Sequence, residues 1–443
     1  MHSRLLRLLK FLPAGAALLL LGGVLFNAAA LSKPGHHRHH KKSPSFVQKG
    51  KQVFRFDTFG DESFWGGALQ LHRAIEGSKH GGIGGGLSPK AALGAGLKVD
   101  ADALPKAVKK ALAAGKVNLN DPATAMTLIK LNAVLGVKGH FNSSGTQMTS
   151  VGLTCAVCHS TVDNSFAPGI GHRLDGRPNR DLNVGAVISL APNLKPVTDA
   201  LGADEATVRK VLASWGPGKF DAELFMDGKA FRPDGGDAAT LIPPAFGLAG
   251  VDLHTFTGWG SVPYWNEFVA NLEMHGQGNF SDARLNDSSR FPLAAKAGLA
   301  NVRHSPDLVT PAIPALHAYE LSLLPPKPPK GSFDRAAAAR GKGVFMGQGK
   351  CSTCHVPPTF SDPGWNLHKP SEICTDSFQA DRSPTGMYRT TPLRGLWSHQ
   401  KGGFYHDGRF QTLAQVVDHY DSCFGLKLTP QQKSDLAQYL KSL

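Results

Sequence analysis

The chain has six cysteines, and four of them occur in two C-x-x-C-H units that begin at residues 155 and 351. Two thiols at this spacing can add to the two vinyl groups of one haem, and the histidine that follows can then ligate the iron. The predicted attachment cysteines are Cys155, Cys158, Cys351 and Cys354, and the predicted proximal iron ligands are His159 and His355. The sequence therefore predicts two covalently attached c-type haems.

Zinc ribbons and thioredoxin-like redox sites also use C-x-x-C units. A zinc ribbon places its two units about 15–20 residues apart. Here His159 and His355 are 196 positions apart (355 − 159). A thioredoxin-like site has no need of the histidine. The spacing and the histidine therefore both favour haem.

Two cysteines, Cys374 and Cys423, lie outside these motifs, and both follow the second one. In an oxidising compartment an even remainder of cysteines predicts a disulfide. The alternative is a pair of free buried thiols.

The N-terminal segment predicts export. Arg4, Arg7 and Lys10 precede an apolar run at residues 14–26, and three alanines at 28–30 offer a small-residue cleavage site. The apolar run is short for a membrane span. We therefore expect a signal peptide at 1–30 and a periplasmic or secreted protein, with an uncleaved membrane tether as the alternative. A basic, His-rich linker follows at 31–49.

The composition is globular and loop-rich, with 41% hydrophobic residues, 50 Gly and 30 Pro. The formal net charge is +14, but no basic stripe is interleaved with aromatic residues, so we expect no nucleic-acid partner. A basic surface can instead steer a small acidic redox protein toward the chain.

We expect a mainly α fold with two cytochrome c-like haem domains, at residues 50–324 and 335–443. A Pro-rich linker at 325–334 separates them. Residues 50–54 (GKQVF) echo residues 341–345 (GKGVF). Four further residues recur 120 positions later (436 − 316): Leu316, Tyr319, Ser322 and Leu323 match Leu436, Tyr439, Ser442 and Leu443. Such first and last helices, crossing over a haem, are typical of small cytochromes c.

The first domain carries a long insert at residues 55–154. Alternating apolar and polar residues predict helices at 102–114 and 121–135, the second with an Asp cap and Pro at its first position. We expect few or short strands.

The sixth ligand of each iron decides what the haem can do. A Met or His there gives a closed electron carrier, whereas a weak or absent ligand leaves room for peroxide. The candidates for the first haem are His172, Met274, His275 and Met148. The candidates for the second are Met387, Tyr420, His419 and His406.

Residues 391–396 (TPLRGL), residues 404–408 (FYHDG), and then Leu413, Val416 and Val417 resemble the C-terminal haem domain of the bacterial dihaem cytochrome c peroxidase family. That family includes enzymes that mature a tryptophan-derived quinone cofactor. Its patterns P-[ST]-L-R-N and P-Y-F-H-D-G are close to the segments found here but not identical. The resemblance covers about 335–443 well and the first unit only around 150–200.

The resemblance bears on the sixth ligands. In the peroxidases a Met ligand follows the histidine of the P-Y-F-H-D-G pattern by 14 residues. The matching position here, counted from His406, is Tyr420, and the quinone-maturing relatives have Tyr there. Residues 170–172 (IGH) are similar to the loop that holds the displaceable distal histidine of the peroxidases, which favours His172.

The resemblance also implies a calcium ion between the domains, with Asn179 and Thr391 near where its ligands would fall. It further implies an acid–base glutamate in the first haem domain. No residue matches that position, and the available acids are Glu62, Glu223, Glu267 and Glu273.

Two functions follow from these features. The first is a dihaem c-type cytochrome that transfers electrons in the periplasm. The alternative is a peroxidase-like enzyme that reduces hydrogen peroxide with electrons from a donor cytochrome. Both need a small redox protein as partner. Iron coordination discriminates between them.

Overall fold

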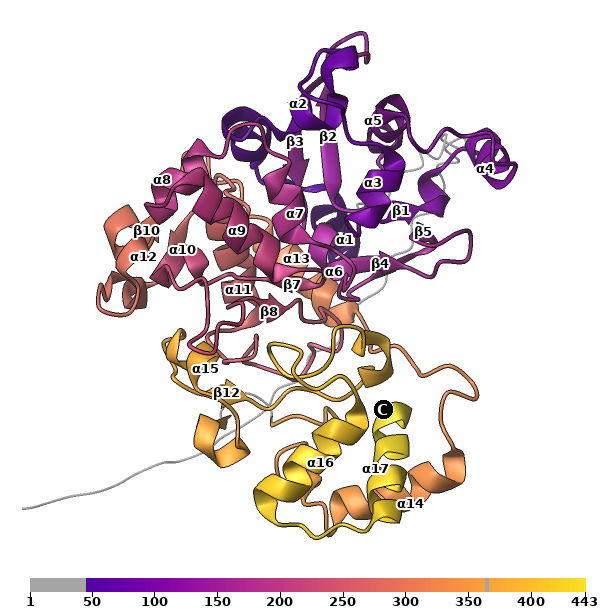
Figure 1. The fold of residues 1–443 in the computed structure, drawn as a ribbon, viewed down its shortest axis with the longest axis vertical. Coiled ribbons are helices and arrows are strands. Elements are labelled where there is room, and N and C mark those ends of the chain that lie inside the picture. The colour runs from indigo at the N-terminus through magenta and orange to yellow at the C-terminus, as the bar shows by residue number, and fades with distance from the viewer. Residues whose placement is uncertain (1–44, 363–365) are drawn as a thin grey trace, which may run out of the picture. The chain divides into compact units, whose positions relative to one another are not determined.

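The structure is a computed structural model that describes residues 45–362 and 366–443. The predicted signal peptide and most of the His-rich linker lie outside the described residues. Residues 44–443 form one compact unit. Its fold is mainly helical, and its strands are short (Figure 1).

The regular elements follow the chain from residue 46 to residue 442. The helices are α1 (Phe46–Phe56), α2 (Leu71–Glu76), α3 (Pro89–Gly94), α4 (Lys106–Ala113), α5 (Pro122–Lys130), α6 (Ala156–His159), α7 (Val184–Ser189), α8 (Lys195–Leu201), α9 (Glu205–Trp215), α10 (Leu224–Asp227), α11 (Val262–Phe268), α12 (Pro292–Ala297), α13 (Ile313–Ser322), α14 (Arg335–Met346), α15 (Phe378–Asp381), α16 (Leu413–Phe424) and α17 (Pro430–Ser442).

The strands pair in twos. One pair is parallel, β1 (Val99–Asp100) with β5 (Ile170–Gly171). The antiparallel pairs are β2 (Val137–Phe141) with β3 (Met148–Leu153), β4 (Ser160–Val162) with β6 (Arg173–Asp175), β7 (Lys219–Phe220) with β8 (Thr240–Leu241), β9 (Phe280–Ser281) with β10 (Asn301–Val302), and β11 (Leu367–His368) with β12 (Tyr388–Arg389).

Two helix pairs cross closely, α1 with α13 and α14 with α17. Each crossing needs a glycine. A Cβ on Gly50 would collide with the backbone carbonyl of Ala315, and a Cβ on Gly341 would collide with that of Asp435. These glycines open the echoed segments GKQVF and GKGVF, so the repeated sequence corresponds to a repeated close approach of two helices.

The aromatic contacts at the two crossings also repeat. Phe54 meets Tyr319 edge to face at a ring-centroid distance of 5.5 Å, and Phe345 meets Tyr439 in the same way at 5.2 Å. Edge-to-face packing of this kind adds about 0.5–1.5 kcal/mol beyond the area that the rings bury. The matched serine of each last helix donates to the carbonyl of its tyrosine, at 2.6 Å in both cases.

The insert at 55–154 is less helical than expected. Helix α4 begins at Lys106, after Pro105, and α5 ends at Lys130 instead of continuing to residue 135. The β2–β3 hairpin then occupies residues 137–153. Its turn is built on Asn142, whose side chain accepts hydrogen bonds from the backbone N–H of Thr146 and of Gln147. Side-chain bonds of this kind compete with helix formation. The apolar and polar pattern of the insert did not indicate this hairpin.

A buried ion-pair cluster joins the part of the chain before the Pro-rich segment to the part after it. Arg382 follows α15 and is fully buried. Its guanidinium lies 2.9 Å from Asp221 and 2.8 Å from Asp227, and it also donates to the carbonyl of Ala238 at 3.1 Å. Removing one partner from a buried pair leaves an uncompensated charge and costs roughly 3–5 kcal/mol. Arg382 therefore fixes α15 against the α10 region.

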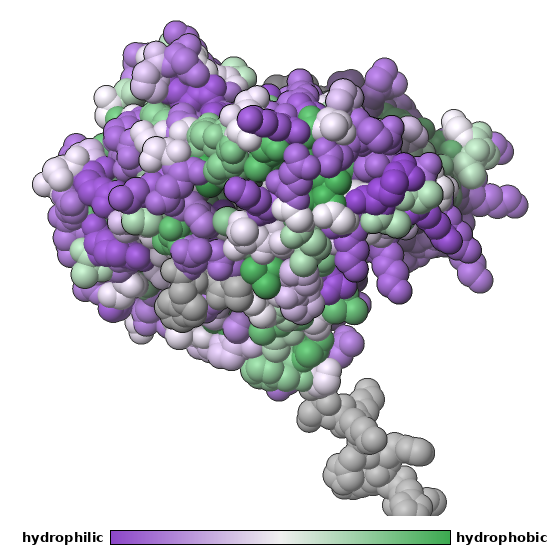
Figure 2. Space-filling model, turned by 90° about the horizontal axis from the view of Figure 1, so that it is seen from below, coloured by the Kyte–Doolittle hydropathy of each residue, from purple (hydrophilic) through white to green (hydrophobic). Residues whose placement is uncertain are grey.

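The face in Figure 2 is largely hydrophilic, with hydrophobic residues in smaller separate areas. The large hydrophobic side chains that are exposed come from many elements: Phe46, Ile83, Leu190, Phe231, Leu308, Leu324, Met346, Val356 and Phe424. Within residues 45–362 and 366–443, no helix has both the length and the apolar character needed to cross a bilayer.

Candidate functional site

The two C-x-x-C-H motifs line the same cavity, which has a volume of about 780 Å³. The first motif contributes Cys155, Cys158 and His159, and the second contributes Cys351, Cys354 and His355. Most of the other lining side chains are apolar. A large apolar cavity with a few converging polar groups is typical of a cofactor site.

The first motif forms the short helix α6, directly after strand β3. Backbone hydrogen bonds hold it from both flanks. The N–H of Asn179 donates to the carbonyl of Cys158, and the N–H of Gly176 donates to that of His159, each at 2.8 Å. Gly136, at the start of the β2–β3 hairpin, has a positive φ of 72° and no room for a Cβ against Val157. The hairpin therefore packs directly on the motif.

The second motif begins in a single 3₁₀ turn, Cys351–Thr353. Lys350, just before it, has a positive φ of 52°. The turn closes when the N–H of His355 donates to the carbonyl of Cys351 at 2.9 Å. Helix α14 leads into this turn, so the α14–α17 crossing positions the second motif.

Both motif histidines have the same hydrogen bond on Nδ1. His159 Nδ1 lies 3.1 Å from the carbonyl of Pro243, and His355 Nδ1 lies 3.0 Å from that of Phe360. A carbonyl accepts only, so Nδ1 carries the proton and Nε2 keeps its lone pair. Burial also lowers the pKa of His159, to about 4. Each histidine is therefore a neutral ring whose Nε2 can ligate a metal, the arrangement expected of a haem ligand.

The motif cysteines are free thiols, and burial raises the pKa of Cys158 to about 12 and that of Cys351 to about 11. They do not gather into a zinc-type site. Among the described residues, one group of His, Cys, Asp and Glu side chains has the geometry to hold an ion, and it contains no cysteine: Asp376, His406 and Asp407. Two separate C-x-x-C-H units on an apolar cavity fit two haems.

Two of the four candidates for the sixth ligand of the first haem line the cavity, Met274 and His275. They follow the π-helical turn Val269–Glu273, and His275 has a positive φ of 60°. The ring of His275 stacks on Phe64 at a centroid distance of 3.6 Å.

The other two candidates lie elsewhere. The side chain of His172 is 62% exposed, and its Nδ1 lies 3.0 Å from the Asp102 carboxylate. Met148 is packed in the hydrophobic core. The loop resemblance favoured His172, but the structure places it outside the cavity-lining set.

For the second haem, Tyr420 and His406 line the cavity, whereas Met387 and His419 do not. Tyr420 lies on α16, and burial raises its pKa. His406 stacks on Tyr388 at 5.2 Å, and its buried Nε2 lies 3.5 Å from the carboxylate of Asp376. The geometry therefore leaves an oxygen ligand and a nitrogen ligand as alternatives.

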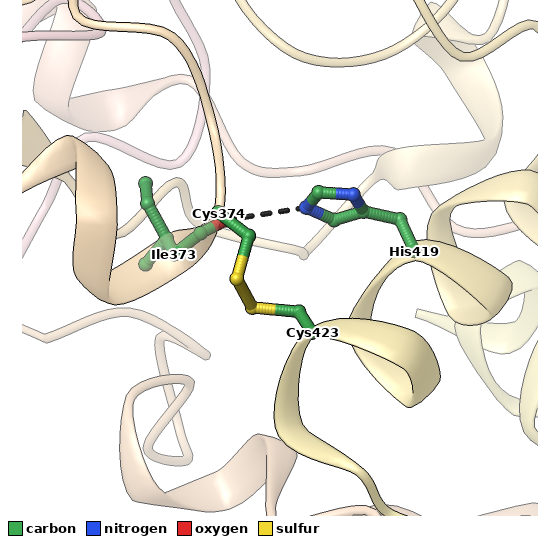
Figure 3. Close-up of a disulfide and its surroundings, with 4 residues drawn as sticks. All are labelled: Ile373, Cys374, His419 and Cys423. Carbon is green, nitrogen blue, oxygen red and sulfur yellow. Dashed lines mark hydrogen bonds between the residues drawn. A yellow bond between two sulfur atoms is a disulfide. The ribbon is translucent and has the colours of Figure 1, made fainter.

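Cys374 and Cys423 form a disulfide, with their Cα atoms 5.9 Å apart (Figure 3). Cys423 lies on α16, three residues after Tyr420. Beside it, His419 Nε2 lies 3.1 Å from the carbonyl of Ile373. The last turn of α16 is therefore attached twice to residues 373–374.

Buried acids also line the cavity, and nothing in the sequence distinguishes them from the other candidate acid–base glutamates. Glu223 and Glu273 are lining residues with 5% and 8% exposure. Both carboxylate oxygens of Glu273 and Oε2 of Glu223 have no hydrogen-bond partner among the described residues. Burial raises the pKa of Glu273 well above its usual value, and the charges of Glu223 and Asp221 raise it further. Glu62 and Glu267 are not lining residues.

The two residues near the expected calcium site have other contacts. The amide nitrogen of Asn179 donates to the carbonyls of Gly96 and Val157, and its oxygen accepts from the N–H of Asp181. Thr391 lines the cavity. The calcium ion stays a prediction.

Comparison with known proteins gives a distant sequence similarity. No protein-family model matches the chain. The methylamine utilization protein MauG of Methylorubrum extorquens is 29% identical over 125 residues, which cover 24% of this chain and 35% of MauG. The chain thus matches about a third of the length of that relative. The similarity agrees, at a distant level, with the resemblance seen in the motifs.

Two solved structures are similar over about half of the chain. A MauG-like protein associated with microbial copper homeostasis has a TM-score of 0.31 and 16% identity, covering 50% of this chain and 79% of that one. Hydrazine synthase of Kuenenia stuttgartiensis has a TM-score of 0.29 and 19% identity, covering 48% of this chain and 76% of that one.

Proposed function

We propose that this chain is an exported dihaem c-type cytochrome of the peroxidase-like kind. The cavity beside the first motif would receive peroxide, and the second haem would pass on electrons from a small donor redox protein. One observation carries this choice. Glu273 is a buried acid with no hydrogen-bond partner in the part of the chain that the structure describes, and it lines the same cavity as His159.

A pure electron carrier has no use for such an acid. An unpartnered buried polar group costs roughly 1–3 kcal/mol, and a cluster of raised carboxyl pKa values is typical of sites that move protons. Peroxide reduction needs protons, because hydrogen peroxide, two electrons and two protons give two water molecules.

Bound at His159, a haem would supply the redox chemistry of the site. The protein would supply protons and exclude water. Burial and the neighbouring acids raise the pKa of Glu273 and so favour its protonated form, and a protonated Glu273 would donate a proton to the departing oxygen of peroxide, which leaves as water. Glu223, buried beside it, would return a proton to Glu273.

The second haem would have the electron-relay role. Tyr420 lies on a helix that a disulfide attaches at its last turn. A ligand held in this way would keep the second iron closed to small molecules.

An electron carrier is the second candidate function, because Met274 and His275 both line the cavity near the first motif. If either ligates the first iron, that iron is closed as well. Glu273 would then have no iron-bound peroxide to protonate.

Low-temperature EPR of the holoprotein, oxidised and half-reduced, tests the proposal. We expect a high-spin ferric signal in at least one state, with a spectral change on adding peroxide. If both irons are low-spin in both states and peroxide changes neither, the protein is a carrier.

The variant Glu273→Gln removes the acid and keeps its size. We expect peroxide-dependent turnover to fall by roughly 10²–10⁴-fold, the usual contribution of a general acid, with haem content unchanged. Glu267→Gln is the matched control, because Glu267 lies on the preceding helix α11 and does not line the cavity. Equal turnover in the two variants would remove Glu273 from the mechanism.

A further inference from the structure

Three arginines line the cavity, Arg180, Arg389 and Arg394. Arg394 is exposed, whereas Arg180 is buried and Arg389 partly buried, and among the described residues neither of these two has an acid to pair with. Most of the other buried arginines of this chain have one. Arg173 pairs with Asp175, and Arg382 with Asp221 and Asp227. Within the described residues, no carboxylate lies at ion-pair distance from Arg180 or Arg389. Arg180 and Arg389 thus lack the carboxylate partner that Arg173 and Arg382 have.

Arg180 is 8% exposed, and its Nε is buried with no hydrogen-bond partner in the described chain. Its one side-chain hydrogen bond is long, 3.5 Å from Nη1 to the carbonyl of Lys401. Burial alone lowers the pKa of this guanidinium, to about 10. A buried charge without a partner is strongly unfavourable, so the site is built for an anion that the polypeptide does not provide.

Arg389 has a related arrangement. Its Nε donates to the carbonyl of Thr255 at 2.9 Å and its Nη1 to that of Leu253 at 3.0 Å. These bonds fix the plane of the guanidinium, which belongs to the cavity lining. Here too burial lowers the pKa, to about 10, with no acid opposing it.

The two arginines have reciprocal positions. Arg180 directly follows Asn179, whose N–H bonds to the carbonyl of Cys158, yet its side chain reaches Lys401. Arg389 lies next to Thr390, whose carbonyl accepts from Ser361 near the second motif, yet its side chain reaches residues 253–255. Each cation is thus tied to one motif and bonded to the backbone of the other half of the chain.

We propose that Arg180 and Arg389 bind the propionate carboxylates of the two haems. Each haem carries two carboxylates, and planar guanidinium groups bind carboxylates through paired N–H donors. A haem attached at either motif would bring these anions into the cavity that both arginines line. The inference rests on the haem-attachment part of the proposed function and is independent of peroxide turnover.

The haem midpoint potentials test the proposal. A ferrous haem has one positive charge less than a ferric haem, so a nearby fixed cation stabilises the reduced state. We expect Arg180→Leu and Arg389→Leu each to lower the midpoint potential of a haem, and Arg180→Lys to restore most of the loss at that site. The low-frequency Raman bands of the propionates should shift in the same variants.

The matched control is Arg177→Leu. Arg177 is close in sequence and stacks on Trp397 at 5.3 Å, but it does not line the cavity. We expect its loss to leave potentials and propionate bands unchanged. If Arg180→Leu does not accumulate, Arg180→Gln removes the charge while keeping polar contacts and should lower the potential in the same way. If Arg180→Leu and Arg389→Leu have the same midpoint potentials and propionate bands as Arg177→Leu at full haem loading, the proposal is wrong.

A small free anion is the other source of negative charge, and the holoprotein distinguishes it. If the arginines hold such an anion, the wild-type potentials will change as chloride or phosphate is titrated at constant ionic strength, and this too would overturn the proposal. Potentials independent of the added anion are expected for propionates. If the wild-type protein carries no haem, haem attachment itself fails, which is a different result.

Discussion

Glu223 and Glu273 come from the part of the chain between the two C-x-x-C-H motifs and line the cavity that both motifs share. Both are buried, and among the described residues Oε2 of Glu223 and both carboxylate oxygens of Glu273 have no hydrogen-bond partner. Around the second motif, Asp407 is also buried, but Arg409 and Arg232 neutralise it. Glu273 and Glu223 can therefore hold and release protons, whereas Asp407 is held in fixed ion pairs, as Asp221 and Asp227 are by Arg382. The same attachment signal can thus serve a proton-handling site and an electron-relay site, because the side chains around it differ.

The largest expected effect comes from replacing the two cysteines of each C-x-x-C-H motif in turn. We expect Cys155→Ala/Cys158→Ala and Cys351→Ala/Cys354→Ala each to lower the haem content from two per chain to one, measured by pyridine haemochrome. The surviving haem then reports its own site. The first haem alone should show high-spin ferric signals, and the second alone should show low-spin signals.

The control for both is Cys374→Ser/Cys423→Ser, which should keep two haems, because these cysteines form a disulfide instead of attaching haem. Two haems retained in the motif variants would contradict haem attachment at these cysteines. Identical spectra from the two single-haem proteins would show that the regions do not differ.

A smaller effect is expected from removing the Cys374–Cys423 disulfide, which lies in the part of the chain after the second motif. The bond closes a loop with a sequence separation of 49 residues, and on the chain-entropy estimate its loss costs roughly 4 kcal/mol. It also attaches α16 one turn from Tyr420. In Cys374→Ser/Cys423→Ser we expect a lower thermal midpoint and a changed low-spin spectrum of the second haem, while the high-spin signal of the first is kept.

Tyr420→Phe supplies the control for the spectral part. If the disulfide acts by positioning Tyr420, adding the two serines to Tyr420→Phe should change the spectrum no further. An additional change in that background would mean that the disulfide affects the haem by another route.

The repeated helix crossings could be predicted from the sequence. Gly50 and Gly341 open similar segments, and Tyr319 and Tyr439 have matching places in the two last helices. The helical spacing of these residues is local in sequence and can be read directly, whereas their partners across each crossing, such as Ala315 for Gly50, are distant in sequence. The spacing within each C-x-x-C-H motif is equally local, so the sequence alone indicates the two motif histidines, and their role as iron ligands stays a prediction.

The place of Glu273 on the cavity and of His172 outside its lining was not predictable from the sequence, and His172 as an iron ligand stays a prediction. Glu273 is 114 residues from His159 (273 − 159), and only the tertiary fold brings both to one cavity. His172 has glycine before it, as a residue near a haem would, but its loop lies on the surface beside Asp102. A side chain's burial and its lack of a partner are properties of the whole fold.

The smallest expected effect is a difference in how the two regions respond to pH. Asp61, fully buried behind the first motif, accepts from the N–H of Leu153 at 3.1 Å, and burial raises its pKa from 3.8 to about 9. Above pH 4 the unfolded chain loses this proton while the folded chain keeps it, so the free energy of unfolding falls as the pH rises toward 9. Asp61→Asn should remove this slope and add on the order of 1–3 kcal/mol at pH 8.

Asp407 should show the opposite dependence. Burial opposes its ionisation, but the hydrogen bonds and charge of Arg409, together with the charge of His406, hold its pKa below the usual 3.8. Its stabilisation is present above pH 4 and is lost as the pH falls through the folded-state pKa. In Asp407→Asn we expect a loss of about 1.5–3 kcal/mol at pH 7 and a flatter profile below pH 4. Urea unfolding from pH 2 to 9 measures both slopes. If the two variants change the profile in the same direction, the acids of the two regions are not held in different electrostatic states.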